Sequence, residues 1–167
     1  MLDCLDVKNK NTKIILLGNT DEAKYIDSNY KFYEKNIINL AGKTSFNDFI
    51  YLHFLAKTIV SNDSASGHLA HYFKKKSYTF IGGGHFKRFF PYPVKKNTKH
   101  KYIFKKMKCF NCNWNCVYDN LTQKKFPCID EIDTKIHNNS TISLAELGQW
   151  KPSITRVEVP ESIESKL

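Results

Sequence analysis

Apolar residues gather in short runs that end at small or polar residues. The clearest runs are "KIILLGN" at residues 13–19, "TIVSND" at 58–63 and "YTFIGGG" at 78–84. Short continuous apolar runs bounded by turn residues are typical of strands that are buried on both faces. A fainter run at Ile37 and Ile38 stops before Gly42. The pattern predicts four buried strands, each followed by a loop.

Helical patterns lie between these runs. Thr20 and Asp21 offer N-caps for a short helix, and Ser45 with Asp48 forms a capping-box pattern at the start of a clearer one. A third helix is expected over 67–73. The second helix has an apolar face, made by Phe46, Phe49, Ile50, His53 and Phe54. Strands alternating with helices predict an α/β fold, an open and mostly parallel sheet with helices on both faces.

The pattern changes after residue 93, where the chain becomes basic, irregular and rich in cysteine. Two short helices are expected at 131–136 and 144–150, and a loosely held tail after them. We therefore expect four parts: a polar tail at 1–12, a partial Rossmann-like domain at 13–93, a basic cysteine-containing segment at 94–130, and C-terminal helices and tail at 131–167.

Length and composition suit a single globular domain. The chain has 167 residues, of which 41% are hydrophobic and 25% charged. No apolar run approaches the roughly 20 residues that span a bilayer, so no transmembrane segment is predicted. The first residues, "MLDCLDVKNKNTK", lack the apolar stretch of a signal peptide, and a cytoplasmic location is the expectation.

The charge is strongly positive, with 26 Lys and Arg against 16 Asp and Glu and a net +10. Such an excess favours anionic partners, which include nucleic acid, membrane phosphates and nucleotide diphosphates. A solvated surface in a chain biased towards lysine explains the charge equally well. The densest basic stretch covers residues 95–108.

The loop "SNDSASGHLAHYF" after the third strand is the first stretch with evident chemistry. The strand delivers Asp63 at its carboxyl end, where open α/β sheets bind their ligands. Ser64, Ser66 and Gly67 are small enough to let a diphosphate approach the amides of a helix N-terminus, and His68 can donate a hydrogen bond. The alternative is that Asp63 and Ser64 cap the helix while His68 packs locally.

Four cysteines follow the pattern Cys109-x2-Cys112-x3-Cys116-x11-Cys128. Such spacing is typical of a closed, tetrahedral metal site, in which thiolates hold zinc or iron and stabilise a segment with little core of its own. Free buried thiols are the alternative. Cys4 lies far away in the sequence and is interpreted as an ordinary free thiol.

The 46 residues from "NLAGKTS" to "FIGGG" (39–84) resemble the C-terminal half of family 9 glycosyltransferases, the heptosyltransferase family. The family's Asp-Thr-Gly-x-x-His-x-Ala motif falls on residues 63–70, with Ala65 in place of its first glycine. The resemblance implies a GT-B C-terminal domain that binds the diphosphate of a sugar nucleotide such as ADP-heptose. The implied donor-binding residues are Asp63, Ser64, Ala65, Ser66, Gly67, His68, Gly82, Gly83, Gly84 and His85.

The stretch "GGGHFKRFFPYP" before the cysteines is similar to the branch that contains bacterial autotransporter heptosyltransferases. Those relatives carry an iron-binding cysteine finger in this place, so the resemblance favours iron over zinc on the four cysteines. Family enzymes also have a preceding domain for a glycan or protein acceptor. The chain begins at what corresponds to the second strand of the donor domain, so the sheet is expected to be incomplete and the chain inactive alone.

Two other functions remain open. A metal-stapled basic module could bind nucleic acid, since the chain has the charge, the cysteines and many aromatic residues. A catalytically silent assembly subunit is the third hypothesis, because the exposed edge of an incomplete sheet invites pairing and homo-oligomers.

Overall fold

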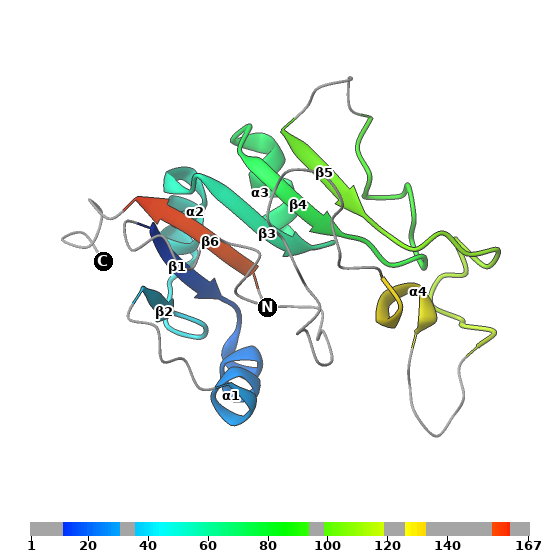
Figure 1. Cartoon of the computed structure of the whole chain (residues 1–167), viewed down its shortest axis with the longest axis horizontal. Coiled ribbons are helices and arrows are strands. Elements are labelled where there is room, and N and C mark those ends of the chain that lie inside the picture. Colours follow the sequence, from blue (N-terminus) through cyan, green and yellow to red (C-terminus); the bar gives the residue numbers. More distant parts are fainter. Residues whose placement is uncertain (1–11, 31–35, 94–98, 119–125, 133–154, 161–167) are drawn as a thin grey trace.

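A computed structural model describes residues 12–30, 36–93, 99–118, 126–132 and 155–160 (Figure 1). The elements in chain order are β1 (Thr12–Leu17), α1 (Thr20–Asn29), β2 (Ile37–Asn39), α2 (Phe46–Leu55), β3 (Thr58–Asn62), α3 (Ala65–Tyr72), β4 (Lys76–Phe80), β5 (His100–Ile103), α4 (Pro127–Asp130) and β6 (Thr155–Pro160).

These strands form one sheet in the order β2-β1-β6-β3-β4-β5. The pairs β1–β2, β3–β4 and β4–β5 are parallel, so the predicted α/β class with a mostly parallel sheet is confirmed. β6 runs antiparallel to both of its neighbours and lies between β1 and β3 (Figure 1). The expectation of a loosely held C-terminal tail is therefore wrong for Thr155–Pro160.

The central position of β6 has a physical reason, because β6 covers the inner edges of β1 and β3. Within the described strands, β1 pairs with β2 and β6 but not with β3, so without β6 two inner edges would lack backbone partners. Unpaired edges of apolar strands are costly and prone to aggregation. The six registered positions from Thr12↔Pro160 to Leu17↔Thr155 give β1 a partner along its whole length.

Alternate residues of the strands feed two hydrophobic clusters, one on each face of the sheet. Ile14 and Leu16 of β1 pack in the cluster that contains Ile26 of α1. Ile15 and Leu17 point to the other face, where the cluster includes residues of α2 and α3. Helices therefore cover both faces, as the alternating pattern predicted.

The capping box of α2 is present, with the Asp48 amide donating to the Ser45 hydroxyl oxygen at 3.2 Å. The cap of α1 differs from the prediction. Asn19 caps this helix, and its side-chain oxygen accepts from the amides of Asp21 and Glu22, each at 2.9 Å. The Glu22 carboxylate accepts a hydrogen bond from the Asn19 amide, so Asn19 and Glu22 form a complete capping box.

The predicted apolar face of α2 is only partly buried. Leu52 and His53 are buried, but Phe46 is 76% exposed and Phe54 is 53% exposed. Because α2 carries apolar residues around most of its circumference, the sequence could not decide which side faces the sheet.

The predicted helices at 131–136 and 144–150 fall outside the described residues beyond Ile132. α4, which begins at Pro127, ends just where the first of them was expected. None of the helices in the described ranges is long and apolar enough to cross a membrane.

Candidate functional site

Parallel strands bring several loops to one edge of the sheet. β3 and β4 pair in register from Thr58↔Lys76 to Asn62↔Phe80, so both end at the same level. The Asp63 amide extends the ladder by donating to the Phe80 carbonyl at 3.0 Å. The loop that starts α3 therefore lies beside the loop that starts with Ile81, at the carboxyl edge where such sheets bind ligands.

Buried polar atoms without a protein partner gather at the end of β3. The Oγ atoms of Ser61 and Ser64 and both side-chain polar atoms of Asn62 are buried and make no hydrogen bond. Ser64 is the N-cap of α3, yet its side chain makes no capping bond. An unsatisfied buried polar group costs about 1–3 kcal/mol. Of these, the Ser64 hydroxyl lies at the start of α3, where a polar ligand could supply the missing partner.

Ser61 and Asn62 were not among the predicted site residues. The sequence could have pointed to them, because the polar pair "SN" ends an otherwise apolar strand. In the structure Asn62 is only 7% exposed. Side chains alternate along a strand, so Ser61 points towards α3 and Asn62 towards the opposite face. An ideal Cβ on Gly67 would lie 3.3 Å from the Ser61 hydroxyl, which confirms the first of these directions.

Asp63 is half-buried between two histidines. Burial raises the pKa of its carboxyl, and the electrostatic influence of His68 and His85 lowers it. Three residues that the resemblance assigned to the donor site therefore lie near one another. A carboxyl between two imidazoles can exchange hydrogen bonds or a proton with a bound molecule.

His68 is held in place by neighbours that lie far away in the sequence. Its Nδ1 atom lies 2.6 Å from the Tyr92 hydroxyl oxygen. Its ring stacks on Phe90 with a centroid distance of 4.4 Å and an angle of 26° between the planes. Local packing of His68 is therefore real, and it fixes the ring beside Asp63. Tyr92 was not predicted as part of this arrangement, since nothing in the sequence links it to residue 68.

The glycines of the site have a packing reason of their own. A Cβ on Gly67 would lie 2.9 Å from the Phe90 ring. A Cβ on Gly82 or Gly84 would come within 2.5 Å or 2.4 Å of the Trp114 ring. A Cβ on Gly83 would lie 2.5 Å from the Phe110 ring. The glycine triplet thus admits two aromatic rings from the cysteine segment, and its contact with a donor stays a prediction.

We call residues 109–116 together with Cys128 the cysteine finger. The amides of Asn111 and Asn113 donate to the carbonyls of Gly83 and Gly84 at 2.8 Å and 3.1 Å. The Gly83 amide in turn donates to the Cys128 sulfur at 3.4 Å. Backbone bonds therefore attach the finger to the loop after β4.

Three residues of the finger adopt positive φ angles, namely Asn111, Asn113 and Trp114, at 68°, 51° and 64°. Asn tolerates the left-handed region of backbone angles better than most other residues with a side chain, whereas Trp114 is strained there. The tight turns direct the Trp114 ring onto the glycine triplet.

The four cysteines are free thiols in this structure. Burial raises the pKa of the Cys128 thiol, the Gly83 amide lowers it, and the nearby Cys109, Cys116 and Cys112 raise it again. Across the described ranges, however, no group of three or more His, Cys, Asp or Glu side chains is arranged to hold a metal ion. The four thiols as placed do not form a coordination site, and the predicted metal remains a prediction.

The fold and the polar edge define an α/β domain of the class that binds ligands where parallel strands end. A family model of glycosyltransferase family 9 (heptosyltransferase) matches residues 5–118, and the chain belongs to this family. No curated protein and no solved structure matched the chain.

Proposed function

We propose that the carboxyl edge of β3 binds the diphosphate of a nucleotide-activated sugar, such as ADP-heptose, for transfer to a glycan or protein acceptor. The membership of family 9 supports a nucleotide-sugar donor and a glycan acceptor in general. The observation that carries the proposal is the buried Ser64 hydroxyl at the start of α3, which has no hydrogen-bond partner.

In this proposal the start of α3 supplies the binding groups. Ser64 makes no cap of its own, so its hydroxyl can donate to a phosphate oxygen near the positive end of the helix. His68, oriented by Tyr92, donates from the same side. Asp63 suits the hydroxyl groups of the sugar, since a half-buried carboxyl would repel a phosphate.

The test is calorimetric titration of the full chain with ADP, ADP-heptose, AMP and adenosine. We expect binding of the two diphosphates and weak binding of the other two. Ser64→Ala should weaken ADP binding about tenfold, the effect of one lost hydrogen bond to a charged group. The same change should leave the unliganded protein as stable or more stable, because it removes an unsatisfied buried hydroxyl.

Ser28→Ala is the matched control, since Ser28 is exposed and bonds only to the Lys24 carbonyl of its own helix. Equal binding of ADP and adenosine, or an unchanged affinity in Ser64→Ala, would contradict the proposal.

We also propose that the chain corresponds to the donor half of a family enzyme and transfers no sugar by itself. The carboxylates of Glu22 and Asp48 are engaged in helix caps, Glu131 pairs with Lys105, and Asp63 is assigned to the donor in this proposal. These are poor candidates for the base that must accept a proton from an acceptor hydroxyl. Transfer of heptose from ADP-heptose to a lipopolysaccharide-type acceptor by the purified chain would contradict this.

Finally, we propose that iron, or zinc as the alternative, binds Cys109, Cys112, Cys116 and Cys128. Support comes from the spacing of the four cysteines in the sequence and from the Gly83 amide, which ties Cys128 to the loop that also holds Asn111 and Asn113. Loading would require the thiols to rearrange. Elemental analysis of protein purified without chelator is the test, with visible absorption to separate an iron-thiolate site from colourless zinc. Absence of both metals from the wild type, or equal loading of a Cys112→Ser variant, would contradict this proposal.

A further inference from the structure

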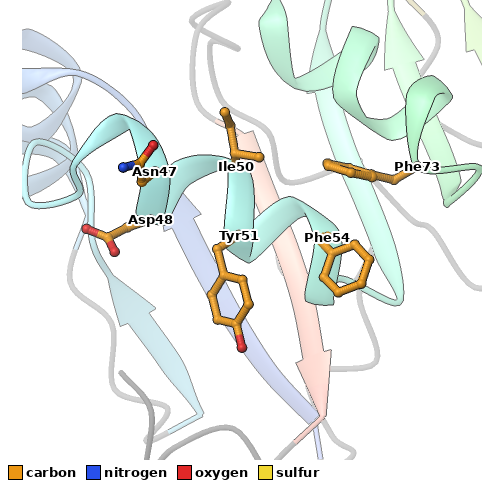
Figure 2. A pocket seen from close by; sticks show the side chains of 6 residues that line it. All are labelled: Asn47, Asp48, Ile50, Tyr51, Phe54 and Phe73. Carbon is orange, nitrogen blue, oxygen red and sulfur yellow. The ribbon is translucent and has the colours of Figure 1, made fainter.

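The outer side of α2 and the end of α3 form an exposed apolar surface. We call its members, Ile50, Tyr51, Phe54, Tyr72 and Phe73, the aromatic face. Tyr51 is 44% exposed, Phe54 53% and Tyr72 77%. Figure 2 shows Tyr51 and Phe54 projecting from α2, with Phe73 across from Phe54 and Ile50. Most of these side chains line a shallow cavity of about 520 Å³.

Lysines gather next to this surface, at the edge where the parallel strands begin. The register Thr58↔Lys76 places Lys57 beside Lys75. We call this group the lysine edge. Its members are Lys57, Lys74 and Lys75; the neighbouring Lys76 is left out, because its ammonium lies 5.6 Å from the centre of the Tyr78 ring, in the cluster on the opposite face of the sheet.

The aromatic face and the lysine edge are one continuous surface. Tyr72 and Phe73 directly precede Lys74 in the chain, and the Lys75 ammonium lies 5.3 Å from the centre of the Phe54 ring. The acidic residue at the far end of the cavity, Asp48, is held by the Ser45 cap. The surface therefore combines exposed apolar rings with an excess of positive charge.

We propose that this surface docks on an anionic lipid bilayer. Apolar and aromatic side chains insert about 5–10 Å into the boundary between headgroups and acyl chains, and lysines beside them attract acidic headgroups. Lysine stems lie along the apolar surface while the ammonium groups reach the headgroups. Docking at this edge leaves the candidate donor site, at the opposite ends of the same strands, facing away from the lipid.

Two other occupants fit the surface less well. A second copy in a symmetric contact would bring two lysine edges together, and like charges across an interface are costly. Single-stranded nucleic acid stacks its bases on open ring faces. The Phe54 ring lies under the Lys75 ammonium and meets Phe73 edge to face at 72°, which leaves it poorly open to stacking.

The test is co-sedimentation of the full chain with vesicles of phosphatidylcholine containing about one third phosphatidylglycerol. We expect binding at low salt, loss of binding at about 1 M salt, where the Debye length is about 3 Å, and little binding to pure phosphatidylcholine. Lys74→Gln with Lys75→Gln should lower the partition coefficient about 25-fold, from about fivefold per lysine.

The matched control is Lys106→Gln with Lys108→Gln, which removes the same charge from two exposed lysines elsewhere. It should change the partition coefficient less than about twofold, since the lysines lie outside the contact. Tyr72→Ser tests the apolar part, and the 77% exposure of this side chain makes the change harmless to the fold. We expect about a tenfold loss of vesicle binding.

A Tyr72→Trp variant reports on the contact directly. Brominated lipids should quench its added fluorescence beyond the quenching of the wild type, whose own tryptophans are Trp114 and Trp150. Equal losses in the two lysine pairs, no added quenching, or no vesicle binding at low salt would each overturn the proposal. The proposal would also be overturned if the protein did not bind vesicles but bound a labelled oligonucleotide, or dimerised, in a way that requires Tyr72.

Discussion

The Nδ1 atom of His68 lies 2.6 Å from the hydroxyl oxygen of Tyr92, 24 residues further along the chain. This contact joins the start of α3 to the segment that leaves the glycine triplet, and it sets the orientation of an imidazole beside Asp63. The same tyrosine ring packs against His71 at 4.4 Å and Phe90 at 5.1 Å. Its hydroxyl can therefore be removed while the ring contacts remain.

Tyr92→Phe should weaken ADP binding about tenfold and lower the free energy of unfolding by about 1 kcal/mol, the contribution of one hydrogen bond. Calorimetric titration and urea unfolding measure the two effects. Tyr102→Phe is the control, because it removes a buried hydroxyl on the same side without a bond to His68. Equal affinities in the two variants would show that Tyr92 does not position His68.

Gly84→Ala should dislodge Trp114 from the loop after β4. The new Cβ would lie 2.4 Å from the indole ring, so one of the two groups must move, at a cost of about 1–3 kcal/mol. Urea unfolding and a red shift of tryptophan emission measure the change. Gly18→Ala serves as the comparison, because its nearest neighbour is the end of the flexible Glu22 side chain, and it should cost less. A Gly84→Ala protein with unchanged emission would contradict the packing described for the finger.

Val157→Pro should destabilise the protein by about 3 kcal/mol or more. Residue 157 pairs with Ile15 on one side and Ile59 on the other, and proline removes a ladder donor from a central strand. Phe46→Pro, at the exposed first position of α2 where proline is tolerated, is the control and should have little effect. Urea unfolding measures both. Equal stabilities would mean that β6 does not hold the two parts of the sheet together.

Acid should destabilise the fold through His53. This side chain is buried, its Nδ1–H donates to the Phe49 carbonyl at 2.6 Å, and its Nε2 has no partner. Burial lowers its pKa below the ordinary 6.5, and burial with nearby His71 lowers that of His100 as well. The unfolded chain therefore binds more protons than the folded one below about pH 6.5, and stability falls as the pH falls through this range.

His53→Leu should flatten the dependence of unfolding free energy on pH between about 6.5 and the folded pKa. Leu55→Ala loses apolar packing from the same helix without losing a titrating group, so its slope should match the wild type. Urea unfolding at several pH values gives the slopes. A His53→Leu slope that equals the wild-type slope would contradict the assignment.

The sequence predicted the parts of the fold that local patterns determine. The strands at β1, β3 and β4 follow from continuous apolar runs, and the Ser45 cap follows from a side chain that bonds within its own turn. The exposed side of α2 could not be predicted, because a helix that is apolar around its circumference gives no preferred direction. Nor could β6, whose place depends on partners at the opposite end of the chain.

The residues of the candidate site likewise fall into those that the sequence predicted and those that it could not predict. The run from Asp63 to His68 was found from its position after a strand and from the family motif. Ser61 and Asn62 became visible only through their burial without partners, and Tyr92 through a contact across 24 residues. The glycine triplet was assigned to donor binding, whereas the structure shows that Trp114 and Phe110 also require it.

The position of β6 constrains the order in which the protein can fold during synthesis. Thr12 pairs with Pro160, so the centre of the sheet closes only after residues 155–160 have left the ribosome, well after β1 to β5. Until then β1 and β3 each lack a partner on the edge that β6 covers, and contacts between such distant residues form slowly. A chaperone that binds extended apolar segments would have its longest opportunity in this interval.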